Sequence, residues 1–159
     1  MSDTIDVYRG DLQPRRDFLD YGLFVTIFPQ LVAGPVERAS RLLPQVEVER
    51  RWSTRAFTSG IGLALWGGFK KIVIADTIAP YVDSVFMHTA PSAAMVAAAT
   101  VGFAIQILTD FSGYTDIARG TARMLGFELM LNFDHPYLAA NPSEFWRRWH
   151  ISFSSWIRD

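Results

Sequence analysis

Residues 141–158 carry the side chains best suited to acid–base chemistry. Asn141-Pro142-Ser143-Glu144 predicts a helix start, because Asn is a good N-cap, Pro suits the first helical position and Glu the third. If this helix continues to residue 158, its aromatic residues and His150 fall within an arc of about 140°. Arg147 and Arg148 lie outside that arc. We therefore expect His150 at the border between an aromatic face and a polar face.

A histidine at such a border suits proton transfer, because burial lowers the pKa of the imidazole and keeps it a neutral base. The alternative is an interfacial histidine that hydrogen-bonds a backbone carbonyl, and the spacing alone favours this alternative. His88, in a loop flanked by proline, and His135, directly before Pro136, are predicted to be turn or interface residues.

Other familiar catalytic patterns do not match. Asp110, Asp116 and the pair Asp134-His135 fit no standard metal-ligand spacing, and we predict turn or capping roles for them. The glycines at 60–62 and 67–68 match neither the dinucleotide-binding fingerprint nor the phosphate-binding loop. The sequence has no G-x-S-x-G motif, which argues against a soluble serine hydrolase. We predict neither a metal nor a cofactor.

Composition narrows the protein class. Of 159 residues, 50% are hydrophobic and 19% are charged, a balance that excludes intrinsic disorder. The net charge of −1 supplies no general basic field for nucleic acid. The chain has no cysteine, so disulfides, cysteine-ligated metals and thiol nucleophiles are excluded.

Long uncharged stretches predict contact with a membrane. The strongest candidate span is 84–109, which contains no Asp, Glu, Lys or Arg; a buried core helix is the alternative. Residues 21–36 are also uncharged, but Pro29 and Pro35 interrupt them, so this stretch could cross the membrane or dip in and return. The glycine-containing stretch 111–131 includes two arginines, which break any clean span.

The lysines at 70 and 71 complicate another apolar stretch. Residues 56–69 are apolar, and apolar sequence resumes at Ile72. This stretch is either re-entrant or a helix whose lysines face a protein interior. The Arg-rich residues 37–55 favour a cytoplasmic position. The predicted fold class is all-α, a multi-helix integral membrane protein fragment with re-entrant or interfacial helices.

Four stretches have distinctive residue combinations: F-P-Q-L-V-A-G-P-V at 28–36, D-F-S-G-Y-T-D-I-A at 110–118, N-F-D-H-P-Y at 132–137 and F-W-R-R-W-H-I-S at 145–152. They resemble the signatures of the membrane-bound O-acyltransferases, and I-D-V-Y-R-G at 5–10 and F-K-K at 69–71 also fit. Departures are Phe153, where Leu is usual, and Asp134, where Asn or Lys is common. Ser112 favours the branch that acetylates alginate, since the branch that transfers D-alanine to teichoic acid usually has Ala there.

This resemblance implies an incomplete domain. Family members are much longer and have two important histidines. His150 matches the supporting histidine of the R-W-H-x-S motif, whereas the one regarded as catalytic lies in a later W-H-G motif, beyond Asp159. Residues 1–159 are thus expected to be an interior fragment of the acyltransferase domain, without the N-terminal spans and the catalytic-histidine segment, and inactive alone.

The resemblance also implies a function and partners. We expect transfer of an acyl group, acetyl above all, to hydroxyls of an exported polysaccharide such as alginate. Expected partners are the lipid bilayer, an acyl donor, the polysaccharide and other polysaccharide-modification proteins, at the bacterial cytoplasmic (inner) membrane in a multi-pass arrangement. D-alanyl transfer to teichoic acid and a non-catalytic scaffold of a secretion complex are the alternatives. The residues expected to bind donor or substrate are Arg147, Arg148, Trp149, Asp110, Ser112 and Tyr114.

Overall fold

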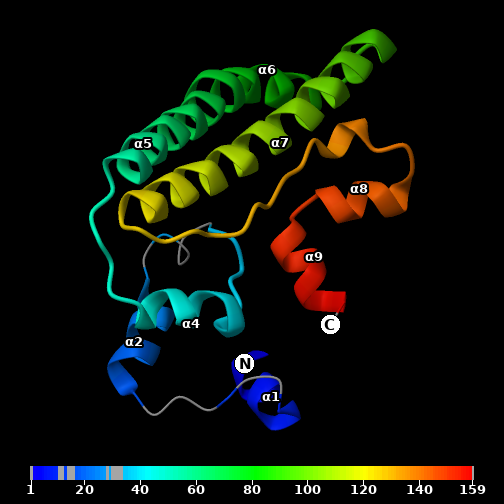
Figure 1. Cartoon of the computed structure of the whole chain (residues 1–159). Helices are drawn as coiled ribbons and strands as arrows, with labels where there is room; N and C mark the ends of the chain where they lie inside the picture. The colour runs from blue at the N-terminus through cyan, green and yellow to red at the C-terminus, as the bar shows by residue number, and fades with distance from the viewer. Residues whose placement is uncertain (1, 11–12, 14–16, 28, 30–33, 159) are drawn as a thin grey trace.

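The computed structural model describes residues 2–10, 13, 17–27, 29 and 34–158 (Figure 1). These residues form helices joined by loops; within the described ranges the only β-type pairing is an isolated bridge between Phe133 and Trp149. The helices are α1 (Ser2–Arg9), α2 (Phe18–Thr26), α4 (Ala39–Glu47), α5 (Thr54–Gly68), the π-helix η1 (Phe69–Ala75), α6 (Asp76–Phe86), α7 (Ala93–Met124), the 3-10 helix η2 (Pro136–Leu138), α8 (Pro142–Arg148) and α9 (Ile151–Arg158). The all-α prediction is confirmed.

A long helical hairpin forms the centre of the fold. The continuous helical segment α5–η1–α6 packs antiparallel to α7 along most of its length (Figure 1). Each arm begins at a serine cap: Ser53 Oγ accepts from the amide of Ala56 at 3.3 Å, and Ser92 Oγ accepts from that of Met95 at 3.3 Å.

Two pairs of glycines allow the arms of this hairpin to touch. A Cβ on Gly60 would lie 2.6 Å from the carbonyl oxygen of Gly120, and one on Gly67 would lie 2.5 Å from that of Gly113. Within each helix the two glycines are seven residues apart, which is about two helical turns. They therefore lie on one face of that helix. Gly113 and Gly120 of the stretch 111–131 thus serve the close approach of backbones.

The predicted span 84–109 is divided between two helices. Ser84 lies in the last turn of α6, a turn follows at Met87, and α7 starts only after the cap at Ser92. The helix then continues to Met124, and Arg119 and Arg123, which were predicted to break a clean span, pair with carboxylates. Among the described helices, α7 alone is long and apolar enough to cross a membrane. The prediction of a span here is confirmed, with different bounds.

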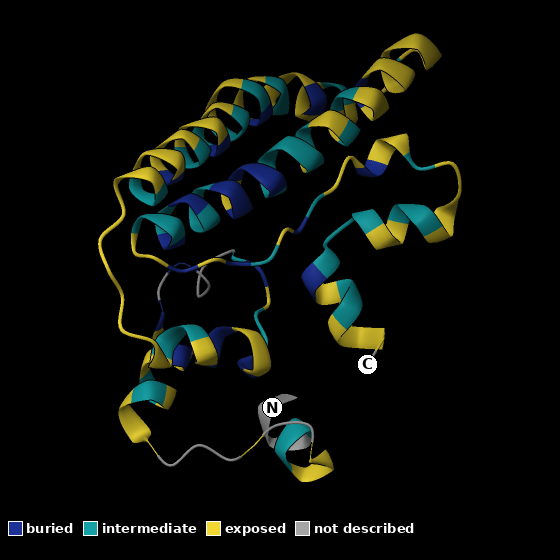
Figure 2. Ribbon diagram, viewed as in Figure 1, coloured by how far each residue is buried: buried dark blue, intermediate teal, exposed yellow. Residues whose placement is uncertain are grey.

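The small core lies beside the C-terminal end of α7. It joins α2 and α4 to the segment after α7, and its buried members are Phe24, Ile27, Ala39, Leu42, Leu43, Ala122, Phe127 and Leu129. In Figure 2 the buried part of α7 is the half beside α5, whereas the opposite end of α7 and much of α6 are exposed. The predicted apolar segment 21–36 is described only in part: 18–26 form α2, and residues 28 and 30–33 lie outside the described ranges.

The predicted helix 142–158 is wrong in one respect. Its start is confirmed, since Asn141 Oδ1 accepts from the amide of Glu144 at 2.9 Å. However, α8 ends at Arg148, His150 has a φ of +43°, and α9 starts at Ile151. A left-handed residue cannot continue an α-helix, so the chain turns sharply here. The continuous helix on which we placed His150 at the border of two faces therefore does not exist.

Candidate functional site

His150 occupies the junction between α8 and α9. Its carbonyl accepts from the amide of Ser154 at 2.9 Å, so it supplies the first bond of α9. A non-glycine residue in the left-handed region costs on the order of 1–3 kcal/mol and persists only where its surroundings hold it. The backbone at this junction is thus set by contacts with other parts of the chain.

Asn132 makes those contacts. Its carbonyl accepts from the amide of Ile151 at 2.9 Å. Its side-chain Oδ1 accepts from the Ser152 hydroxyl at 2.6 Å and from the Ser152 amide at 3.3 Å. Asn132 and Ser152 are both buried. Asn132 therefore fixes the first turn of α9 and, through it, the conformation of His150.

The same cluster reaches the segment before α4. The Ser152 hydroxyl accepts from the amide of Val36 at 3.0 Å, and the carboxylate of Glu37 accepts from the amide of Met130. Burial raises the pKa of Glu37, while the Met130 hydrogen bond and nearby arginines oppose that rise. Residues of three sequence motifs thus contact one another next to His150; these motifs are 28–36, 132–137 and 145–152.

Aromatic rings surround the imidazole. The His150 ring lies 4.7 Å from Phe111 in a T-shaped arrangement, 5.1 Å from Phe153 and 6.5 Å from Phe133, between centroids. Burial lowers the pKa of His150, as predicted for a neutral base. Within the described ranges no residue hydrogen-bonds the ring, so the backbone-carbonyl partner of the alternative interpretation is not observed. The ring nitrogens are available to a ligand.

A second cluster joins η1 to α7. Lys70 forms an ion pair with Asp116 and donates to the Ser112 hydroxyl at 3.1 Å. Lys71 contacts the carboxylates of Asp110 at 2.7 Å and Asp76 at 2.6 Å. Successive side chains are separated by a smaller angle in a π-helix than in an α-helix, which helps both lysines to reach α7. The interpretation in which the lysines face a protein interior is supported.

This cluster corrects the roles predicted for two carboxylates. Asp110 and Asp116 lie in the middle of α7 rather than in a turn or cap, and they are the partners of Lys71 and Lys70. The spacing missed this because the lysines come from a segment about forty residues earlier. Asp134 does lie in a turn, where its carboxylate is 3.1 Å from Nδ1 of His135. His88 also lies in a turn, and its Nδ1 accepts from Ala90 at 3.2 Å.

The remaining predicted residues are divided between the two clusters. Trp149 packs on Phe133 and Phe145, at 5.0 and 5.5 Å between centroids. The Tyr114 ring lies 5.4 Å from the Lys71 ammonium. Because Asp110 and Ser112 flank Phe111, the lysine–carboxylate cluster continues directly into the aromatic shell of His150 on α7.

The two arginines of α8 differ in availability. Arg148 contacts the Glu144 carboxylate at 2.5 Å. The hydrogen bond from the Ala140 amide, followed by the one from Arg148, lowers the pKa of Glu144. Arg147 hydrogen-bonds the hydroxyl and carbonyl of Ser143 at 3.2 and 3.4 Å, and it acts on the Glu144 carboxylate only through its charge, without an ion pair between these two described residues. Of this pair, Arg147 is the one free to meet an anion.

Sequence reasoning missed Asn132, Phe111 and Phe133 as site residues. Each lies inside or beside a motif, but their proximity to His150 depends on the left-handed turn. That turn has no signature in residues 145–152 themselves.

The fold and site define a helical membrane protein in which a half-buried histidine, with its pKa lowered by burial, adjoins a lysine–carboxylate cluster. The sequence profile of the membrane-bound O-acyltransferase family matches residues 12–159, and the chain belongs to this family.

Several curated proteins are similar to the chain. A protein of Azotobacter vinelandii described as a probable alginate O-acetylase is 42% identical over 159 residues, which is all of this chain and 32% of that protein. The peptidoglycan O-acetyltransferase of Helicobacter pylori is 39% identical, covering 89% of this chain and 28% of its own. The teichoic acid D-alanyltransferase of Bacillus subtilis is 28% identical, covering 86% and 35%. The chain thus spans about a third of the length of these relatives.

Proposed function

We propose that this chain is the part of a membrane-bound O-acyltransferase that carries its supporting histidine. The whole enzyme transfers an acyl group, acetyl above all, to hydroxyls of an exported polysaccharide such as alginate. One observation carries the proposal: His150 is held in a left-handed turn, inside an aromatic shell, with its ring nitrogens free for a ligand. The similarity to alginate O-acetylases over the full chain supports the choice of acceptor.

The chemistry requires a neutral imidazole. The acceptor hydroxyl oxygen attacks the acyl carbonyl carbon, a new ester C–O bond forms, and the bond to the donor's leaving group breaks. The hydroxyl proton passes to a neutral base and then to the leaving group, a thiolate if the donor is a thioester. His150 remains neutral near pH 7 because burial lowers its pKa. We assign it the orientation of the acceptor or donor, and the family resemblance places the main base on a later histidine.

The donor is proposed to approach from the cytoplasmic side. Arg147 would receive an anionic group of the donor, while Arg148, held by Glu144, stiffens α8 beside it. Trp149 and Tyr114 would line the path. The Arg-rich segment 37–55 orients the protein in the bacterial inner membrane, as part of a multi-pass arrangement.

One contact favours acetyl transfer over D-alanyl transfer. Lys70 donates to the Ser112 hydroxyl at 3.1 Å. The D-alanyl branch usually has Ala at this position, and an alanine cannot accept that bond. The lower identity to teichoic acid D-alanyltransferases agrees with this assignment.

A chimeric enzyme tests the proposal. The segment of the Azotobacter protein that matches this chain over 159 residues would be replaced by the chain itself, in cells that lack their own alginate O-acetylase. We expect acetyl groups on the secreted alginate. A matched chimera with His150→Ala should lose acetylation by about tenfold to a hundredfold at equal protein level, because misplaced reactants cost that much. If both chimeras restore acetylation equally, the role of His150 is refuted and a scaffold function is favoured.

A further inference from the structure

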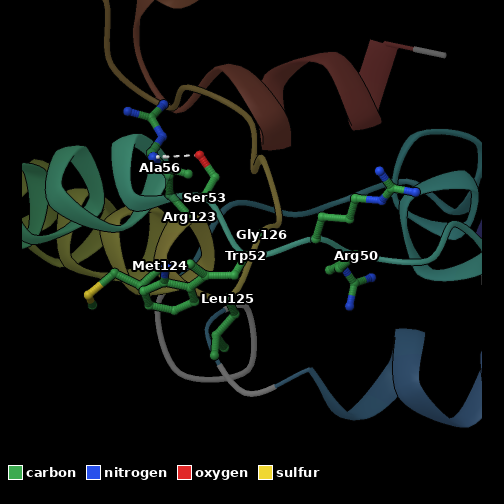
Figure 3. A pocket seen from close by; sticks show the side chains of 9 residues that line it. Arg50, Trp52, Ser53, Ala56, Arg123, Met124, Leu125 and Gly126 are labelled. Carbon is green, nitrogen blue, oxygen red and sulfur yellow. Dashed lines mark hydrogen bonds between the residues drawn. The ribbon is translucent and has the colours of Figure 1, made fainter.

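A basic pocket lies where the N-terminus of α5 meets the C-terminus of α7. It has a volume of about 300 Å³ (Figure 3). One wall comes from the connection that precedes α5, and the other from the last turn of α7 with the residues that follow. The side chains on which the argument depends are Arg50, Arg51, Trp52, Arg123, Met124 and Leu125.

The positive charge of this pocket is only partly neutralised. Arg123 binds the Glu128 carboxylate through two bonds, at 2.8 and 2.9 Å. The Arg50 guanidinium lies 3.4 Å above the centroid of the Phe127 ring and donates to the carbonyl of Gln45 at 2.7 Å, both neutral partners. Arg51 has no hydrogen bond or ion pair with any described residue. Two guanidinium groups therefore face the pocket without a counter-charge.

The start of α5 lies beside the pocket. Ser53 and Ala56 are among the lining residues, and Ser53 Oγ caps the amide of Ala56. The donors that the pocket offers to an anion are therefore guanidinium groups, which bind phosphate oxygens in proteins.

The position of the pocket indicates the source of the phosphate. No charged residue occurs on α5 between Arg55 and Lys70, and Lys70 faces α7, so the apolar outer face of this arm begins directly beside the pocket. The paired arm, α7, is the described helix able to cross a membrane. Trp52 is 72% exposed at this border, and Trp with Arg is typical of the level of lipid headgroups. Met124 and Leu125 offer an apolar wall next to the charges.

We infer that this pocket binds a phosphate-bearing anion, and that its source is the headgroup of an anionic phospholipid. Arg51 and Arg50 contact the phosphate oxygens, and Trp52 and Leu125 lie against the upper acyl chain. Asp110 lies near the middle of α7, whereas the pocket lies at the C-terminal end of that helix. The proposed lipid site does not depend on the acyl transfer proposed above.

The test uses the whole chain in nanodiscs. Thermal unfolding is measured in phosphatidylcholine alone, in phosphatidylcholine with phosphatidylglycerol, and in phosphatidylcholine with added inorganic phosphate. Arg51→Gln removes the unpaired guanidinium of the pocket. Arg55→Gln is the matched control, because it removes an equal charge on the same helical end but does not line the pocket. Arg50 is unsuitable, since it also holds Phe127 and Gln45.

Phosphatidylglycerol should raise the Tm of the unaltered chain and of Arg55→Gln, because a ligand that binds only the folded state stabilises it. The lipid concentration needed for half of that shift should rise about tenfold in Arg51→Gln, through loss of one charge-assisted contact. Equal responses in both variants would overturn the site and leave only general charge attraction. An Arg51-dependent shift caused by inorganic phosphate in phosphatidylcholine, as large as that of the lipid, would overturn the lipid as the source.

Discussion

The side chain of Asn132 controls a residue that it does not touch. Its Oδ1 accepts from the hydroxyl and the amide of Ser152, and the backbone carbonyl of Asn132 accepts from the amide of Ile151. Together these bonds place the first turn of α9 and hold His150 at its positive φ. A single buried amide thus offsets the strain of the left-handed turn.

Asn132→Ala should separate function from folding. The substitution leaves the buried Ser152 donors unpaired, which costs about 1–3 kcal/mol, and it frees the turn at His150. In the chimeric enzyme we expect acetyl content per polymer to fall more than protein abundance, each measured in the same cells. Asn141→Ala is the matched control: it removes the N-cap of α8, at about 1 kcal/mol, without a bond to α9. Equal losses of acetylation in both variants would reject Asn132 as a positioning residue.

The lowered pKa of His150 predicts that the stability of the chain depends on pH. Its folded-state pKa is lowered by burial, whereas the unfolded pKa is the ordinary value of about 6.5. Above that value the imidazole is neutral in both states and contributes nothing to the pH dependence. Below it, the unfolded chain binds the proton more readily, so stability falls as the pH decreases from 6.5 through the folded pKa.

His150→Asn is the suitable variant for this test, because asparagine tolerates the left-handed region and does not titrate. We expect the Tm difference between the unaltered chain and His150→Asn to be constant from pH 7 to 8 and to shift against the unaltered chain below about pH 6.5. The chain in detergent or nanodiscs would be followed by circular dichroism. A difference independent of pH throughout would mean that the imidazole is not buried in the folded state.

At the level of helices, two adjacent glycines of α5 differ in their contact with α7. Gly67 faces α7, where a Cβ would meet the carbonyl oxygen of Gly113 at 2.5 Å and the amide nitrogen of Ile117 at 2.8 Å. Gly68 has nothing within 4 Å of the same position. A substitution at Gly67 therefore tests the packing of α5 against α7, whereas a substitution at Gly68 tests helix propensity.

Gly67→Ala should push α5 away from α7 and destabilise the hairpin by about 1–3 kcal/mol, the usual cost of overpacking. Gly68→Ala should be neutral or stabilising by about 0.5–1 kcal/mol, because alanine favours a helix over glycine. Unfolding of the two variants in the same detergent gives the comparison. If Gly68→Ala is the more damaging of the two, the antiparallel contact at Gly67 is wrong.

A local sequence signal predicted the start of α8 but not its end. The caps at Asn141, Ser53 and Ser92 lie within a few residues of the helix they begin, so their chemistry is readable in the sequence. The end of α8 is different, because the turn that ends it is followed by Ile151 and Ser152, whose bonds to Asn132 come from far outside any local window. The lysine–carboxylate pairs between η1 and α7 were missed for the same reason, since they join residues about forty positions apart.

For the whole molecule, many large apolar side chains lie outside the buried core. The cluster of buried apolar side chains lies in α2, α4, the end of α7 and the segment after it, and the hairpin adds only Ala75, Val82 and Ala99 among the described residues. The helical hairpin instead leaves large apolar side chains on its outer surface, among them Leu65, Trp66, Ile72, Val101 and Phe103. A chain in water rarely exposes a continuous apolar surface of this kind.

We therefore expect the chain, expressed on its own, to partition into membranes or to aggregate. The charged groups of the hairpin strengthen the argument, because Lys70 and Lys71 face α7 and are paired, so they do not hydrate the outer surface. Cell fractionation and size-exclusion chromatography, with and without detergent, test the expectation. Detergent should convert aggregated chain into a species that unfolds cooperatively, since it covers the apolar face of α5 and α7. A monodisperse monomer with a cooperative thermal transition in detergent-free buffer would refute the membrane assignment, because the face would then be tolerated in water.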